Sequence, residues 1–142
     1  MYKDILLPVD LNHESSWKKA LPTALEYCKA FGANLHVMTV VPDFGLPIVA
    51  GYFPKDFESK AREGANKQLH AFVADKVPSD IKVQHIVAEG TVYGEILRVA
   101  KDVGADLILM ASHRPELQDY LLGPNAARVV RHANISVLVV RD

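Results

Sequence analysis

The stretch from Ala111 to Arg131 holds the residues best suited to bind a charged ligand. An apolar run, Leu107 to Met110, leads into a polar segment with one proline, and a helical pattern begins after Gly123. The first backbone N–H groups of a helix have no partner within the helix, and the helix dipole favours negative charge there. Because this helix start should face the end of the preceding strand, the sequence predicts an anion site at that point.

His113 and Arg114 are the side chains of this loop that we single out as functional. They follow the end of a predicted strand, and both can donate hydrogen bonds or carry positive charge. The alternative interpretation is that both are ordinary polar residues on the surface of a loop.

Several other kinds of site are excluded or disfavoured by missing motifs. The sequence has no Gly-x-x-x-x-Gly-Lys-[Ser/Thr] and no lysine after Lys101, which excludes a P-loop NTPase mechanism. It also lacks Gly-x-Gly-x-x-Gly after the first strand and a Gly-x-Ser-x-Gly elbow, so dinucleotide-binding and serine-hydrolase sites are disfavoured. We expect no catalytic residue. We also expect no metal site, because the histidines do not have the spacing of metal ligands. They are His13, His36, His70, His85, His113 and His132.

Composition indicates one ordinary globular domain spanning residues 1–142. The chain is 49% hydrophobic and carries 16 Lys and Arg against 17 Asp and Glu, a balance that argues against a nucleic-acid partner. No apolar run reaches the roughly 18 residues of a membrane span, and we expect no signal peptide before the first strand. The single Cys28, which shares an apolar helix face, rules out an internal disulfide. These features predict a cytoplasmic protein without a membrane partner.

Apolar runs and helical periodicity predict five strands that alternate with four helices. We expect strands over residues 3–10, 35–41, 81–88, 106–110 and 135–140, and helices over residues 17–31, 57–76, 92–103 and 126–133. Strands without polar alternation are typical of a parallel sheet covered by helices on both faces. Such sheets bind ligands at the carboxyl ends of their strands, where Asp10 and Ser112 are expected to lie.

Local signals refine the first helix. N-cap candidates occur between Asn12 and Ser16, and Gly32 is a good helix stop. Pro22 should either kink this helix or mark its first turn. We expect Leu97 and Val103 to be buried on the third helix, together with Ile96, Val99 and Ala100.

Two further segments predict contacts beyond the core. The segment Pro42–Pro54 is unusually apolar for a loop, which indicates a lid, a binding loop or a contact surface, or else a loop folded onto the core. The last strand, Ile135–Val140, would form an apolar sheet edge, and such edges pair readily with another chain. A homodimer through this strand is therefore expected.

The chain closely resembles the universal stress protein family in three segments. These are the opening Ile-Leu-Leu-Pro-Val-Asp at residues 5–10, Gly-Ala-Asp-Leu-Ile at 104–108, and Arg-His-Ala followed by Val-Leu-Val-Val at 131–140. The resemblance covers the whole chain, and the loop after Ala111 is most similar to the UspF-type branch. It implies an α/β fold with three α/β/α layers, Rossmann-like and flavodoxin-like, around a five-stranded parallel sheet in the order 3-2-1-4-5.

The resemblance also implies that ATP, with Mg²⁺ or Mn²⁺, binds across the ends of the first and fourth strands. Asp10 would meet the ribose, and Pro8 and Val9 would lie beside the adenine. The backbone of Val40 would contact the base. The remaining implied nucleotide contacts are Met110, Ala111, Ser112, His113, Arg114, Pro115, Gly123, Pro124, Asn125 and Ala126.

Three positions depart from the family's nucleotide pattern, Gly-x-x-Gly, a nine-residue spacer and Gly-[Ser/Thr]. Ala111 and Arg114 replace the two glycines, and Pro124 replaces the Ser or Thr. Pro124 removes a hydroxyl and a backbone N–H, although proline suits the first helical position. Losing two donors would weaken triphosphate binding by about 1–3 kcal/mol, while Arg114 and Asn125 offer partial compensation.

Three functions stay open at this point. The first is an ATP-binding universal stress protein that acts as a small stress-response regulatory or interaction module. Its hydrolysis would be slow at best, because no lysine clamps the phosphates and no general base is evident. The second is a nucleotide-independent dimeric interaction protein with a degenerate phosphate site. The third is an enzyme on the same scaffold that uses His113 as acid or base.

Overall fold

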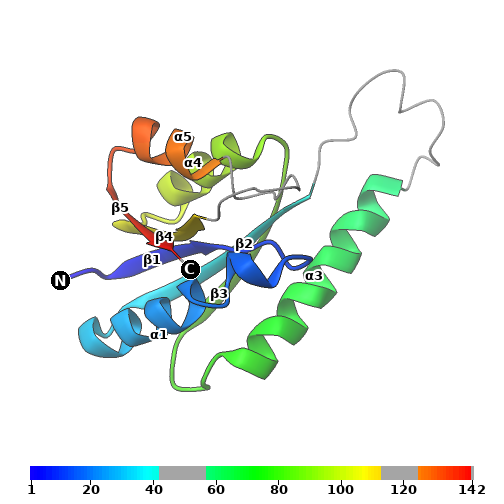
Figure 1. Cartoon of the computed structure of the whole chain (residues 1–142). Helices are drawn as coiled ribbons and strands as arrows, with labels where there is room; N and C mark the ends of the chain where they lie inside the picture. Colours follow the sequence, from blue (N-terminus) through cyan, green and yellow to red (C-terminus); the bar gives the residue numbers. More distant parts are fainter. Residues whose placement is uncertain (42–56, 113–124, 142) are drawn as a thin grey trace.

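A computed structural model of the chain describes residues 1–41, 57–112 and 125–141. Its sheet has five parallel strands in the order β3-β2-β1-β4-β5, which confirms the predicted fold. Figure 1 shows the helices in two layers, with α1 and α3 on one face of the sheet and α4 and α5 on the other. The strands are β1 (Asp4–Pro8), β2 (Asn34–Val41), β3 (Val83–Glu89), β4 (Leu107–Ser112) and β5 (Ser136–Arg141). The helices are η1 (Glu14–Ser16, a 3-10 turn), α1 (Ala20–Phe31), α3 (Phe57–Lys76), α4 (Val92–Asp102) and α5 (Asn125–His132).

The central strand β1 explains why the strands read as continuous apolar runs. Ile5, Leu6 and Leu7 follow one another and have no exposed surface. Ile5 and Leu7 pack into the core beneath α1 and α3, whereas Leu6 packs into the core beneath α4 and α5. Because successive strand residues face opposite layers, both layers require an apolar partner. Each such side chain contributes about 1.5–3 kcal/mol to folding.

The first helix differs from the sequence expectation at its start. It begins at Ala20 rather than near Trp17, and its N-cap, Lys19, makes no side-chain cap hydrogen bond. The expected N-cap residues instead form the η1 turn and the loop before it. Pro22 is the third helical residue, where a backbone N–H has no intrahelical partner, so it lies in the first turn as one alternative predicted. The helix ends at Gly32, whose φ of +65° is the left-handed conformation that favours glycine.

Other element boundaries shift by one or two residues. Strand β4 continues two residues beyond its expected end because Ala111 and Ser112 still pair with β5. Strand β3 starts two residues later than expected, at Val83. Leu97 and Val103 are only partly buried, which corrects the expectation that both are core residues, since they lie at the margin of the α4 face. Within the described ranges, no helix has an apolar stretch long enough to span a lipid bilayer.

Candidate functional site

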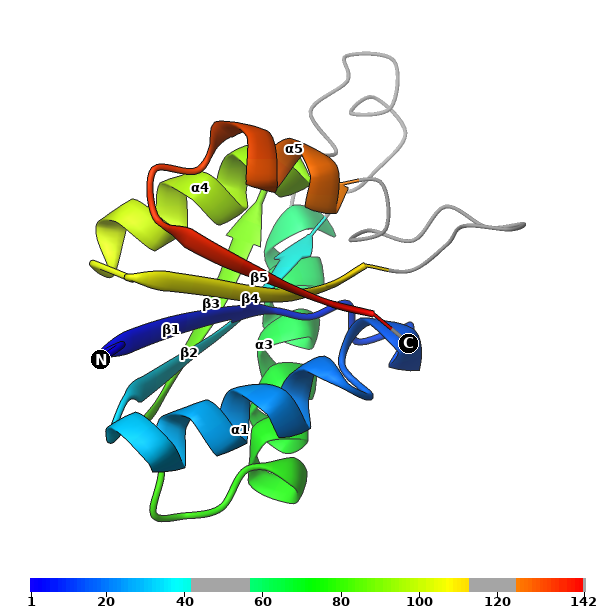
Figure 2. The same ribbon diagram turned by 60° about the vertical axis from the view of Figure 1, so that its left-hand side comes forward.

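The order of the strands reverses beside β1, because the chain goes from β1 to β2 on one side and returns to β4 on the other. Ile5 pairs with Leu107 and Leu6 with Ile108, so the carboxyl ends of β1 and β4 meet at one edge. Figure 2 shows α5 starting at this same edge, beside the end of β4. A sheet edge where the strand order reverses is the usual ligand site of such folds.

The described members of the predicted nucleotide set gather along this edge. Asp10 follows β1, Val40 lies near the end of β2, Ser112 ends β4, and Asn125 begins α5. Pro8, Val9, Met110, Ala111 and Ala126 are also there and are buried. The predicted contacts His113, Arg114, Pro115, Gly123 and Pro124 lie outside the described residues, as does the segment Pro42–Pro54.

The loop after β1 is organised around Asp10, which is 1% exposed. One carboxylate oxygen accepts the backbone N–H of Asn12 at 3.1 Å, and the other lies 2.8 Å from Nδ1 of His13. The Ser16 hydroxyl accepts the Asp10 backbone N–H at 2.9 Å and lies within 2.9 Å of the Asp10 and His13 carbonyl oxygens. Ser16 therefore fixes the backbone of Asp10, a role that the sequence did not reveal.

A cavity of about 340 Å³ opens beside this loop, between the ends of β1 and β2 and the first half of α3. Its volume lies at the lower end of the range for small-molecule sites. Two predicted nucleoside contacts, Asp10 and Val40, line it together. The other lining residues are Leu11, Asn12, Thr39, Val41, Ala61, Gly64, Ala65 and Gln68.

Small residues on α3 leave the room for this cavity. Ala61, Gly64 and Ala65 are three to four residues apart and so share one face of the helix. A Cβ placed on Gly64 would have no atom within 4 Å, which shows how open this side of the helix is. Sequence reasoning missed the contribution of α3, although these small residues at helical spacing were a visible signal.

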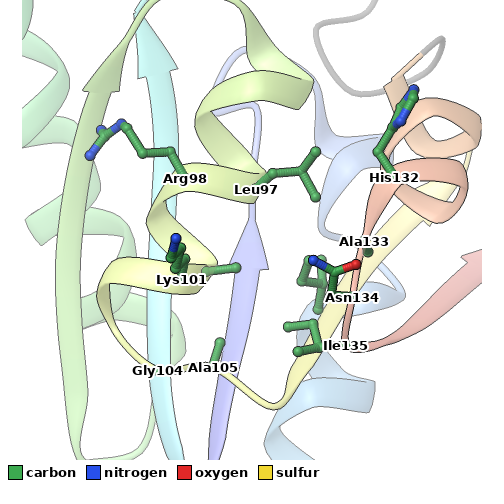
Figure 3. A pocket seen from close by; sticks show the side chains of 11 residues that line it. Leu97, Arg98, Lys101, Gly104, Ala105, His132, Ala133, Asn134 and Ile135 are labelled. Carbon is green, nitrogen blue, oxygen red and sulfur yellow. The ribbon is translucent and has the colours of Figure 1, made fainter.

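A larger cavity, of about 570 Å³, lies toward the opposite edge of the sheet. Figure 3 shows it between α4 and the segment that joins α5 to β5, with Leu97, Asn134 and Ile135 around it. Arg98 at its rim is held by ion pairs to Glu95 (2.7 Å) and Asp102 (2.8 Å). None of the described residues of the predicted nucleotide set lines this cavity. It is therefore not the candidate site.

His36 in β2 has structural partners. His36 is 9% exposed, and its ring nitrogens lie 2.6 Å from Oε1 of Gln84 and 3.0 Å from Oδ1 of Asp4. The hydrogen bond from His36 lowers the pKa of Asp4. His36 lies on a strand face, as expected, and across the described ranges no cluster of three or more His, Cys, Asp or Glu residues is arranged to hold a metal ion.

Comparison with known proteins gives consistent matches along the chain. The model of the universal stress protein family matches residues 1–141. Universal stress protein G of Escherichia coli O157:H7 is 32% identical over 144 residues, covering 99% of this chain and 100% of that protein. The solved structure of MJ0577, a universal stress protein of Methanocaldococcus jannaschii, is similar with a TM-score of 0.73 and 28% identity, covering 100% of this chain and 97% of that chain.

The structure of a universal stress protein from Archaeoglobus fulgidus in complex with dAMP shares the fold. Its TM-score is 0.63 at 17% identity, and the match covers 97% of each chain.

Proposed function

Because this chain belongs to the universal stress protein family, we propose that it binds ATP at the carboxyl edge of β1, β2 and β4. The observation that carries this proposal is that Asp10 and Val40, both expected to contact the nucleoside, line one cavity at the point where the strand order reverses. The dAMP complex of the Archaeoglobus fulgidus relative supports adenine as the base.

The nucleoside end of the proposed site comprises Asp10 and the end of β2. Asp10 is already held by Asn12, His13 and Ser16, so its carboxylate can meet a ribose hydroxyl without a large rearrangement. The Val40 backbone lies at the cavity wall, where it can contact a base edge. Pro8 ends β1 and Val9 follows it, and both are buried.

The phosphate end of the proposed site lies between the end of β4 and the start of α5. Met110, Ala111 and Ser112 are the last residues of β4, and Asn125 and Ala126 begin the helix α5, whose N-terminus favours anions. His113, Arg114, Pro115, Gly123 and Pro124 complete the proposed cradle on sequence grounds alone. Mg²⁺ or Mn²⁺ would accompany the triphosphate and neutralise its charge.

Within the cell, we propose a cytoplasmic stress-response module that switches or recruits other proteins and hydrolyses ATP slowly at most. A homodimer is part of this proposal, because β5 is the last strand of the sheet and offers its backbone to a second chain. No lysine follows Lys101 to clamp the phosphates, which supports binding rather than rapid turnover.

Heating the purified protein and identifying the released small molecules by mass spectrometry tests the proposal. We expect an adenine nucleotide in the extract, and a higher melting temperature when Mg–ATP is added to the emptied protein. An extract without nucleotide, combined with no thermal shift, would instead support a nucleotide-independent interaction protein. Phosphate release faster than a few per minute would support an enzyme.

A further inference from the structure

Thr39 is a buried polar residue on the wall of the cavity beside Asp10. It is 6% exposed and lies in β2, next to Val40. Its hydroxyl makes no hydrogen bond with the part of the chain that the structure describes, yet that part contains no fully buried side-chain oxygen or nitrogen without a partner. The hydroxyl must therefore be reached by solvent, and the cavity provides that access. Because this hydroxyl faces the cavity and bonds none of the described residues, it is available to a ligand that enters the cavity.

Gln68 also lines this cavity, on the α3 face formed by Ala61, Gly64 and Ala65. Its side chain is exposed and, among the residues described, forms no hydrogen bond. A glutamine amide offers one donor side and one acceptor side next to each other. Ala61, Gly64 and Ala65 have small side chains, and a Cβ on Gly64 would meet no atom within 4 Å, so this helix face leaves room for a planar group beside Gln68.

This donor and acceptor pair matches one edge of adenine and mismatches the same edge of guanine. Adenine presents a 6-amino donor beside the N7 acceptor, and glutamine pairs with both at once. Guanine presents two acceptors there, O6 and N7, so one of its hydrogen bonds with the amide is lost. A site built on such a pair discriminates by leaving a polar group unpaired when the wrong base binds.

We propose that Gln68 and Thr39 are the specificity-determining residues of the nucleoside pocket. Gln68 pairs with the 6-amino group and N7 of adenine, and the Thr39 hydroxyl bonds the nucleoside from the cavity wall, so that the site selects adenine over guanine. The proposal rests on nucleotide binding at this edge and adds to it the residues that choose the base.

Isothermal titration of the full chain with adenosine, ATP, 7-deaza-ATP and GTP tests this proposal. The variant Gln68→Ala should weaken ATP binding about three- to tenfold and weaken GTP binding less, because guanine makes only one of the two hydrogen bonds with the amide. In this variant 7-deaza-ATP and ATP should bind with equal affinity, whereas the unmodified chain should bind 7-deaza-ATP more weakly than ATP. Thr39→Val should weaken the binding of adenosine and of ATP by the same factor, about three- to tenfold, because the phosphates do not reach this wall of the cavity.

One matched control lies on α3 and the other just before α4. Asn66→Ala removes an exposed amide from α3 that does not line the cavity, and Thr91→Val removes an exposed hydroxyl before α4. Both should bind every ligand as the unmodified chain does. Equal affinity for ATP and GTP in the unmodified chain, or an unchanged ATP-to-GTP ratio in Gln68→Ala, would overturn the proposal while nucleotide binding stands. An unmodified chain that binds none of the ligands would overturn nucleotide binding, and the base-reading proposal with it.

Discussion

Oδ2 of Asp10 lies 2.8 Å from Nδ1 of His13 in the loop that follows β1, and the Asp10 side chain is 2% exposed while that of His13 is 29% exposed. The same loop returns Ser16 to the Asp10 backbone. These contacts join residues at most six positions apart, so the loop shapes itself largely through its own side chains. The candidate ribose contact is thus held in place before any ligand arrives, which lowers the ordering cost of binding.

Replacing Ser16 by alanine should loosen this loop. The change leaves the buried Asp10 N–H without its hydroxyl partner, which should cost about 1–3 kcal/mol of unfolding free energy. Urea denaturation measures the loss, and titration with Mg–ATP should show weaker binding because Asp10 is no longer fixed. Ser79→Ala, at an exposed position, is the control and should change neither. Native stability in Ser16→Ala would contradict the role that we assign to this hydroxyl.

The stacked histidines of α3 and β3 should make stability fall in mild acid. The rings of His70 and His85 lie 3.9 Å apart and 6° from parallel, and the pKa of His85 is lowered by its burial and then by the charge of His70. The unfolded chain therefore binds a proton that folded His85 resists, so stability is lost as the pH falls below the ordinary histidine value of 6.5.

His85→Phe should reduce this loss, because phenylalanine keeps a ring against His70 and does not titrate. The measurement compares urea unfolding at about pH 7.5 and about pH 5.5, above the range in which Asp4 titrates. His132→Gln, at an exposed position on α5, should retain the full acid-induced loss. The same pH dependence in His85→Phe and the unmodified chain would assign the effect to other groups.

Cys28 should be unreactive in the folded protein. It is 3% exposed, and burial raises the pKa of its thiol to about 11, so almost no thiolate is present at neutral pH. We expect slow reaction with a chromogenic disulfide reagent at about pH 8 and complete reaction of one thiol after unfolding. In the variant Ser79→Cys, the added thiol at an exposed position away from β5 should react at once. Rapid labelling of the unmodified chain would show that α1 opens locally.

Helix α1 also shows where sequence reasoning succeeded and failed. Its apolar spacing predicted that Cys28 is buried, and the continuous apolar residues of β1 predicted a sheet covered on both faces. The predicted start of the helix was wrong because Ser16, a residue type that often caps helices, instead holds the backbone of Asp10. Propensity describes what a side chain can do locally, whereas tertiary contacts decide which option is taken.

The candidate site was predictable only in part for a similar reason. Asp10 follows the apolar strand β1 and Ser112 ends the apolar strand β4, so their position at the carboxyl edge follows from the topology. Thr39 and Gln68 meet at one cavity only because α3 packs across the end of β2. On sequence alone Gln68 belongs to the polar face of an amphipathic helix, and nothing local distinguishes it from its exposed neighbours.

The last strand should join two chains. Val139 is half-buried and, unlike Leu138 and Val140, packs against neither core cluster, so a lysine there should disturb pairing between chains more than folding. Light scattering at micromolar concentration should give twice the 15.7 kDa of one chain, and Val139→Lys should give one chain mass with native circular dichroism. Val130→Lys, 51% exposed on α5, should remain dimeric. A monomeric unmodified chain would refute the dimer.

The central claim is that the carboxyl edge of β1, β2 and β4 binds an adenine nucleotide. Isothermal titration of nucleotide-free protein with Mg–ATP tests it most directly, together with Asp10→Ala and, as its control, the exposed Asp102→Ala. We predict that the unmodified protein binds one ATP per chain. Asp10→Ala should bind ATP at least tenfold more weakly, a loss of about 1.4 kcal/mol of binding free energy, and Asp102→Ala should bind it as the unmodified chain does. No heat of binding in the unmodified chain at millimolar ATP, or equal affinity in Asp10→Ala, would contradict the account.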